Sequence, residues 1–165
     1  MTGYTWATRH ALVKKTFMKI LREYGFNPDP HEPRFKDGKG ADVLFQIEDT
    51  IVIVDVTIVN PLADSYVEAE ALTPGSCLAA ADGRKDRVHG GEAEVRRMEF
   101  YPMALSIFGE LSKRSKDLLT RCAKCVTDGK GFQRHMMSAL AVAVQKGNAS
   151  ILVAAMKGLR ERGVR

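Results

Sequence analysis

The sequence predicts an α/β fold, with a mixed central sheet flanked by helices and a helical extension at the C-terminus. A hairpin is indicated by a short apolar segment, 43–47, and a β-branched run, 51–59, on either side of the turn residues Glu48-Asp49-Thr50. Segments with apolar residues at helical spacing come before and after this hairpin. The 165 residues are expected to form a single domain, with a core over about 5–127 and a helical extension over about 132–162.

The first helix is predicted over 5–24, because one stripe of residues recurs at helical spacing. This stripe consists of Trp6, His10, Val13, Phe17, Ile20, Leu21 and Tyr24. Gly25 follows as the residue that ends the helix. A proline-rich connector then leads to a short first strand, which is expected to end at Phe35.

Two further helical segments are predicted over 66–72 and 78–88, followed by a strand over 98–107. Pro102 lies inside that strand and cannot donate a hydrogen bond to a neighbouring strand. The strand is therefore expected either at an edge of the sheet or with a bulge.

Three helices are predicted at the C-terminus, over 112–126, 132–146 and 149–162. Asn148, which follows Gly147, is expected to cap the last of them. These helices complete the cover of the sheet and form the C-terminal extension.

The composition favours a globular protein with an anionic partner. The hydrophobic and charged fractions, 45% and 27%, are ordinary for such a protein, while the net charge of +5 favours nucleic acid as the first candidate. No apolar run approaches the length of a membrane span and no secretion signal is recognisable, so we expect an intracellular protein without a membrane partner. Three cysteines fit a reducing compartment better than a disulfide framework.

Asp55 is the residue that most needs an explanation, because an acid inside a β-branched run is costly to bury unless it is paired or binds a metal. Asp42 begins the preceding strand, so the hairpin register can bring the two carboxylates together. Such a pair of hard oxygen ligands suits Mg²⁺, which keeps several waters and can deliver one to a phosphodiester. The structural alternative is a hairpin in which Asp55 is hydrogen-bonded or lies at an edge.

Several motifs in a fixed order resemble a known family. They are Arg9-His10, Glu32-Pro33, Ala41-Asp42-Val43, the run from Val54 to Pro61, Phe100-Tyr101-Pro102, Gly109-Glu110-Leu111 and the run from Ala139 to Ala149. Together they are similar to the restriction-like endonuclease domain, of the PD-(D/E)xK fold, at the C-terminus of site-specific non-LTR retrotransposon proteins. The resemblance covers nearly the whole chain and implies a restriction-endonuclease-like sheet.

The resemblance implies a magnesium-dependent endodeoxyribonuclease that nicks DNA and leaves a 3′-hydroxyl for target-primed reverse transcription. Mn²⁺ is expected to substitute for Mg²⁺. DNA is the expected partner, joined by a reverse transcriptase or an RNA–protein complex if the chain is a domain excised from a larger protein. A nuclear location follows if the source is a eukaryotic retroelement.

Carried over by position, the resemblance makes Asp42 and Asp55 metal ligands, with Glu32 as an additional acid and the carbonyl of Val56 as a further oxygen ligand. Thr57 stands where the motif lysine is usual. In this family that lysine comes from a following helix, in a K-x-x-K-Tyr/His pattern.

The nearest match to that pattern is the run from Lys85 to His89, in which Val88 occupies the place of the second lysine. Lys85 or Arg87 must then supply the positive charge, and Arg cannot act as a base at neutral pH. In the favoured mechanism Lys85 orients the attacking water or stabilises the transition state. Lys85 and His89 are one helical turn apart and should face the same way. Expected DNA contacts come from Arg9, His10, Arg87, His89, Arg96 and Arg97, mainly through phosphates.

Two other interpretations stay open. A catalytically degenerate module that binds DNA or a protein partner is favoured by Thr57 and Val88. A basic α/β scaffold without a nucleic-acid role would leave Asp55 unexplained.

Overall fold

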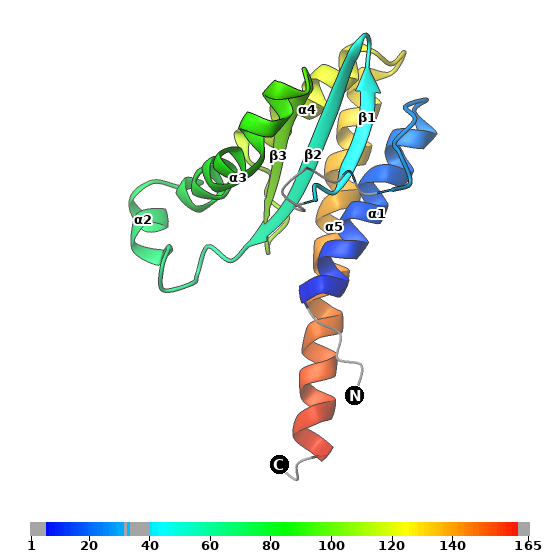
Figure 1. Cartoon of the computed structure of the whole chain (residues 1–165). Helices are drawn as coiled ribbons and strands as arrows, with labels where there is room; N and C mark the ends of the chain where they lie inside the picture. The colour runs from blue at the N-terminus through cyan, green and yellow to red at the C-terminus, as the bar shows by residue number, and fades with distance from the viewer. Residues whose placement is uncertain (1–5, 32, 34–39, 162–165) are drawn as a thin grey trace.

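The computed structural model describes residues 6–31, 33 and 40–161, and Figure 1 shows the arrangement of its helices and strands. In chain order the elements are α1 (Trp6–Glu23), β1 (Val43–Ile47), β2 (Thr50–Val59), α2 (Val67–Leu72), α3 (Ser76–Val95), β3 (Glu99–Ser106), α4 (Lys113–Lys124) and α5 (Gly129–Glu161). The predicted first strand ending at Phe35 and the candidate ligand Glu32 lie outside the described residues.

The sheet of the described residues has three strands in the order β1-β2-β3. β1 and β2 are antiparallel, with Val43 opposite Val54, and β2 and β3 are parallel, with Asp55 opposite Pro102. The sheet is thus mixed, as predicted. Pro102 lies on β3, whose one neighbouring strand within the described residues is β2, so of the two predicted alternatives, an edge strand or a bulge, the structure shows the edge strand.

Helices cover both faces of this sheet (Figure 1). α1, α4 and α5 pack on one face, where their apolar residues form the largest core cluster with Val52, Val54 and Val56 of β2. α3 packs on the other face, and Ile53 of β2 belongs to a cluster on that side. Because side chains alternate along a strand, Asp55 shares the α3 face with Ile53.

The predicted end of the first helix is confirmed. Gly25 has φ +89°, its amide donates to the carbonyl of Arg22, and the amide of Phe26 donates to the carbonyl of Leu21. This pair of hydrogen bonds is the Schellman arrangement, in which a glycine accepts the left-handed conformation.

The prediction of separate helices over 132–146 and 149–162 is wrong, because α5 runs unbroken from Gly129 to Glu161. Gly147 is buried where α1 crosses α5, and a Cβ built on it would lie 2.4 Å from Cγ of Arg9. Asn148 does not cap a helix: its Nδ2 donates to the carbonyl of Ile107 at 2.7 Å, and its Oδ1 accepts from Arg9 at 2.7 Å. The two residues therefore serve a helix crossing.

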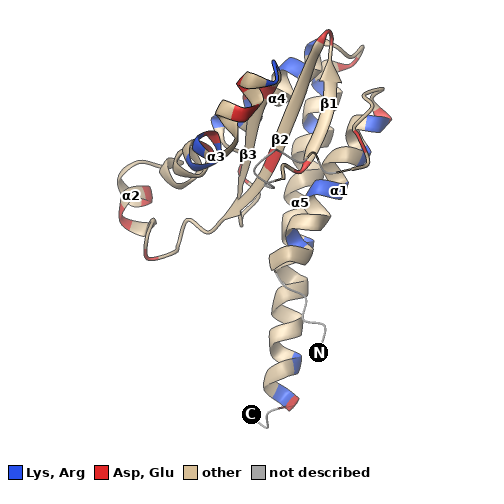
Figure 2. Ribbon diagram, in the orientation of Figure 1, with Lys and Arg blue, Asp and Glu red and all other residues tan. Residues whose placement is uncertain are grey.

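The second half of α5 projects beyond the sheet, and charged residues are sparse along it (Figure 2). Its exposed apolar side chains are Leu152, Val153, Met156 and Leu159. Among the residues that the structure describes, α5 is also the one helix long and apolar enough, by length and composition, to cross a membrane, which the sequence reading had not anticipated. A mostly buried core helix of a water-soluble protein can meet the same criterion, but only 22% of this apolar window is buried in the structure.

Candidate functional site

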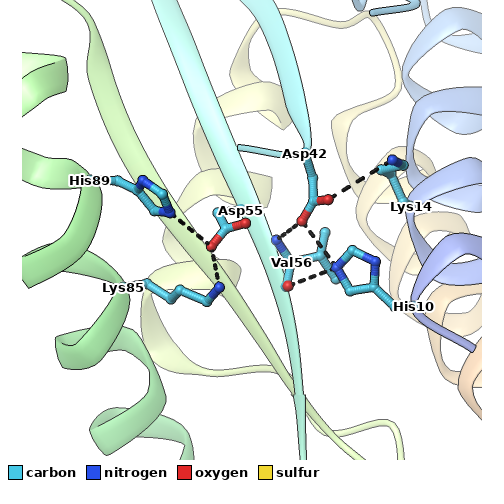
Figure 3. A network of polar contacts seen from close by, with 7 residues as sticks. All are labelled: His10, Lys14, Asp42, Asp55, Val56, Lys85 and His89. Carbon is cyan, nitrogen blue, oxygen red and sulfur yellow. Dashed lines mark hydrogen bonds and ion pairs between the residues drawn. The ribbon is translucent and has the colours of Figure 1, made fainter. Parts of the chain in front are cut away.

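Asp42, which directly precedes β1, lies beside Asp55 of β2 (Figure 3). Val43 pairs with Val54, and continuing that antiparallel register by one position sets Asp42 opposite Asp55. The two carboxyl groups interact closely enough for each to affect the pKa of the other. The hairpin register that brings them together was predictable from the sequence.

Just before β1 begins, the side-chain carboxylate of Asp42 accepts a hydrogen bond from the backbone of β2. Its Oδ2 accepts from the amide of Val56 at 2.7 Å and lies 3.1 Å from Nε2 of His10. Nζ of Lys14 lies 3.9 Å from its other oxygen, Oδ1. Burial alone would raise the pKa of Asp42, but the hydrogen bond and charge of His10 and the Val56 amide outweigh it, so that pKa is lowered.

His10 connects α1 to the same backbone position. Its Nε2 lies 3.0 Å from the carbonyl oxygen of Val56 as well as 3.1 Å from Oδ2 of Asp42. Both oxygens only accept hydrogen bonds, so Nε2 must carry the proton. The hydrogen bond to Asp42 raises the pKa of His10 despite partial burial, and the Val56 carbonyl adds to that rise.

Asp55 is contacted from α3, on the opposite side of the pair. Only 5% of Asp55 is exposed, and its Oδ2 lies 2.6 Å from Nζ of Lys85 and 3.5 Å from Nε2 of His89. Burial, opposed by the Lys85 ammonium and assisted by the negative charge of Asp42, raises the pKa of Asp55 to about 6. Lys85 and His89 face the same way, as predicted from their spacing.

A cavity of about 250 Å³ opens beside these groups. His10, Val56 and Lys85 of the site line it, together with Trp6, Arg9 and Thr57. A small polar ligand bound there would therefore lie against His10, Val56 and Lys85.

The structure gives Arg9 a packing role that the sequence reading did not foresee. Its guanidinium donates to Asn148, and its aliphatic part lies against Gly147 of α5. Desolvation lowers its pKa. Arg9 also lines the cavity, so one face of the side chain holds the helix crossing and another borders the site.

The remaining basic residues of the prediction are dispersed along α3 and just after its end. His89 is only 3% exposed, which argues against the predicted DNA contact and assigns its ring to Asp55. Arg87 and Arg97 are exposed, whereas Arg96 is half-buried and pairs with Glu92 at 2.9 Å. Val88, at the place of the second family lysine, is 44% exposed and points away from the buried side of α3.

Lys14 and the exposed position of Trp6 were missed by sequence reasoning. Lys14 lies one helical turn after His10, so the i,i+4 spacing that was used for Lys85 and His89 would have found it. Trp6 was expected on the buried stripe of the first helix, but 74% of it is exposed. Trp6 is exposed because the N-terminal end of α1 extends past the sheet (Figure 1).

The oxygen atoms of the site suit the Mg²⁺ that the resemblance implies. Asp42, Asp55 and the Val56 carbonyl supply oxygen donors, the type that Mg²⁺ prefers, and one or two carboxylates with waters are usual for it. Asp55 is buried and Asp42 half-buried, and two such carboxyls that affect each other's pKa are also an arrangement that a cation relieves. These residues fit the ion, although the N–H of His10 now points at two of the oxygens.

No group of three or more His, Cys, Asp or Glu side chains that could hold a metal occurs among the described residues. A site with two carboxylates and one backbone carbonyl does not require such a group. Of the neighbouring cysteines Cys122 and Cys125, the first is buried in the core and the second is exposed.

Comparison of the sequence with models of protein families gives no match, and comparison with curated protein sequences gives none either. The likeness to the retrotransposon endonuclease domain therefore stays a prediction that rests on the motifs and their order.

Proposed function

We propose that the chain is a metal-dependent DNA endonuclease with a restriction-endonuclease-like fold, which nicks one phosphodiester and leaves a 3′-hydroxyl. The observation that carries the proposal is the convergence of Asp42 and Asp55 from neighbouring strands with Lys85 on Asp55 Oδ2 at 2.6 Å. Burying the carboxylate of Asp55 beside the half-buried Asp42 costs folding free energy, and such arrangements beside a cavity cluster at functional sites.

Each residue has a separable task in this proposal. Asp42, Asp55 and the carbonyl of Val56 hold Mg²⁺, which when bound supplies an activated water and neutralises charge on the phosphate. Lys85 stabilises the negative charge that develops on the phosphate during attack, because it lines the cavity and its ammonium lies beside Asp55. Lys14 and His10 hold Asp42 in its orientation.

Lys85 also supplies an ammonium group in place of the motif lysine. Thr57 stands at the usual position, yet an ammonium reaches the second carboxylate from α3. Since Val88 is exposed and away from that contact, its replacement of a lysine removes no charge from the pair of carboxylates. Neither Thr57 nor Val88 therefore argues against activity in this proposal.

The second candidate is a catalytically degenerate module that binds DNA or a protein partner. It is favoured by the way the chain's own donors occupy the carboxylates: Lys85 contacts Asp55, and His10 and the Val56 amide contact Asp42. A relic site kept for stability would show the same closed network. A reverse transcriptase or RNA–protein complex as partner, and a nuclear location, belong to either version.

A nicking assay on supercoiled plasmid tests the proposal. The wild-type chain should nick with Mg²⁺ or Mn²⁺ and not in EDTA, and a polymerase should extend the nick without prior end treatment. Asp42→Asn and Asp55→Asn should abolish nicking, while Asp64→Asn, which alters an exposed acid in the loop after β2, should not. No nicking by a folded wild-type chain with any metal would favour the degenerate module.

A further inference from the structure

Trp6 is the only tryptophan of the chain and is 74% exposed. An indole is a large apolar surface that proteins usually bury, and leaving it in water forgoes the free energy that burial would provide. Trp6 lies in the first turn of α1, one turn before His10, and lines the cavity beside the carboxylates. The exposed indole therefore lies beside the proposed nuclease site.

The cavity has a mixed lining. It consists of the aromatic Trp6, the basic Arg9, His10 and Lys85, the hydroxyl-bearing Thr57 and the aliphatic Val56 and Ile58. Its volume of about 250 Å³ is below the usual 300–1,000 Å³ of pockets for drug-sized ligands. A single base with its sugar matches this size and this chemistry, whereas a turn of duplex does not.

We infer that the cavity receives one unpaired nucleotide next to the scissile phosphate, with the indole of Trp6 stacked on its base. The inference rests on the proposed nuclease function and names the form of its substrate. Both faces of an internal base in duplex DNA are covered by neighbouring bases, so a stacking residue can reach only a base that is flipped, frayed or single-stranded. The preferred substrate is thus DNA with an unpaired nucleotide at the nick position.

Because the chain has one tryptophan, its fluorescence reports on this contact directly. The wild-type chain is titrated in EDTA with a short single-stranded oligodeoxyadenylate, and the titration is repeated with Asp55→Asn to remove that carboxylate's repulsion of phosphate. Stacking should quench the fluorescence to saturation. An abasic oligomer of the same length carries the same phosphates without bases, so it should bind through charge and quench far less.

Variants separate stacking from charge. Trp6→Ala should weaken binding of DNA with an unpaired nucleotide by about 5- to 150-fold, the usual effect of losing one stacked base. Binding of a fully paired duplex should change less than about twofold, and Trp6→Phe should restore much of the loss. Phe108→Ala removes an exposed aromatic that does not line the cavity and should change neither affinity.

The inference is overturned if saturating oligonucleotide, followed by the anisotropy of a labelled strand, leaves the fluorescence unchanged. It is equally overturned if Trp6→Ala weakens paired and unpaired DNA to the same extent. Since the titrations involve no cleavage, quenching without nicking would support the stacking inference and contradict the proposed nuclease function. Nicking without quenching would support the nuclease function and contradict the stacking inference.

Discussion

Nζ of Lys85 lies 2.6 Å from Oδ2 of Asp55, and this contact carries a positive charge from α3 to the middle of the sheet (Figure 3). It gives the chain an ammonium beside its buried carboxylate although Thr57 occupies the motif position. The contact links a charge on the helix to the proposed transition state, which makes Lys85 the residue whose removal is most informative.

Lys85→Ala should lower the rate of Mg²⁺-dependent nicking by about 100- to 1,000-fold, because the ammonium is proposed to act in the transition state. Single-turnover nicking rates at saturating metal would measure this. The affinity for Mn²⁺, followed by its paramagnetic resonance, should fall by less than the rate. Lys19→Ala, which removes an exposed lysine of α1 that pairs with Glu23, serves as the control and should nick at the wild-type rate.

Asp55→Asn should stabilise the metal-free fold at neutral pH. The folded pKa of about 6 exceeds the ordinary value of 3.8, so the folded state binds more protons and its stability falls as pH rises from about 4 to 6. The substitution removes that loss, which amounts to at most about 3 kcal/mol. Urea unfolding in EDTA at pH 4 and pH 7 would show it, and a wild-type stability that is flat over this range would contradict the prediction.

Gly147→Ala should lower the free energy of unfolding by about 1–3 kcal/mol, because the added Cβ would meet Cγ, Cβ and Cα of Arg9 at 2.4, 2.7 and 3.0 Å. Gly158→Ala is the matched control on the same helix, since a Cβ built there meets nothing within 4 Å. It should raise stability by about 0.5–1 kcal/mol through helix propensity. Two substitutions with the same sign in thermal unfolding would refute the crossing of α1 over Gly147.

Glu70→Gln should weaken the corner between α2 and α3. The carboxylate accepts from the amides of Gly75 and Cys77 at 2.6 and 2.9 Å, in place of a side-chain cap on α3. These amides lower the pKa of Glu70 to about 2, so its contribution is complete above the ordinary pKa of 4.5 and is lost as pH falls through about 2.

Thermal unfolding between pH 2 and pH 7 measures this contribution. The stability difference between wild type and Glu70→Gln should be largest near neutral pH and should shrink in acid. Glu68→Gln alters an exposed acid of the same short helix and should leave the profile unchanged. A Glu70→Gln profile that parallels the wild type at all pH values would mean that the cap contributes nothing.

The sequence by itself determined the hairpin and the end of α1, and it limited the strand with Pro102 to an edge position or a bulge. These features depend on local rules: β-branched residues favour strands, glycine accepts a positive φ, and proline cannot donate to a neighbouring strand. The pairing of Asp42 with Asp55 belongs to this group, because an antiparallel hairpin with a tight turn fixes which residues face each other.

Only the tertiary structure decided the rest. Gly147 and Asn148 read locally as a helix break, but Arg9 packs against one and bonds the other, so α5 continues through both. The Lys14 contact with Asp42 and the exposure of Trp6 likewise depend on where α1 crosses the sheet. Such outcomes are set by contacts between distant segments, whose energies exceed local propensity and leave no periodic signal in the chain.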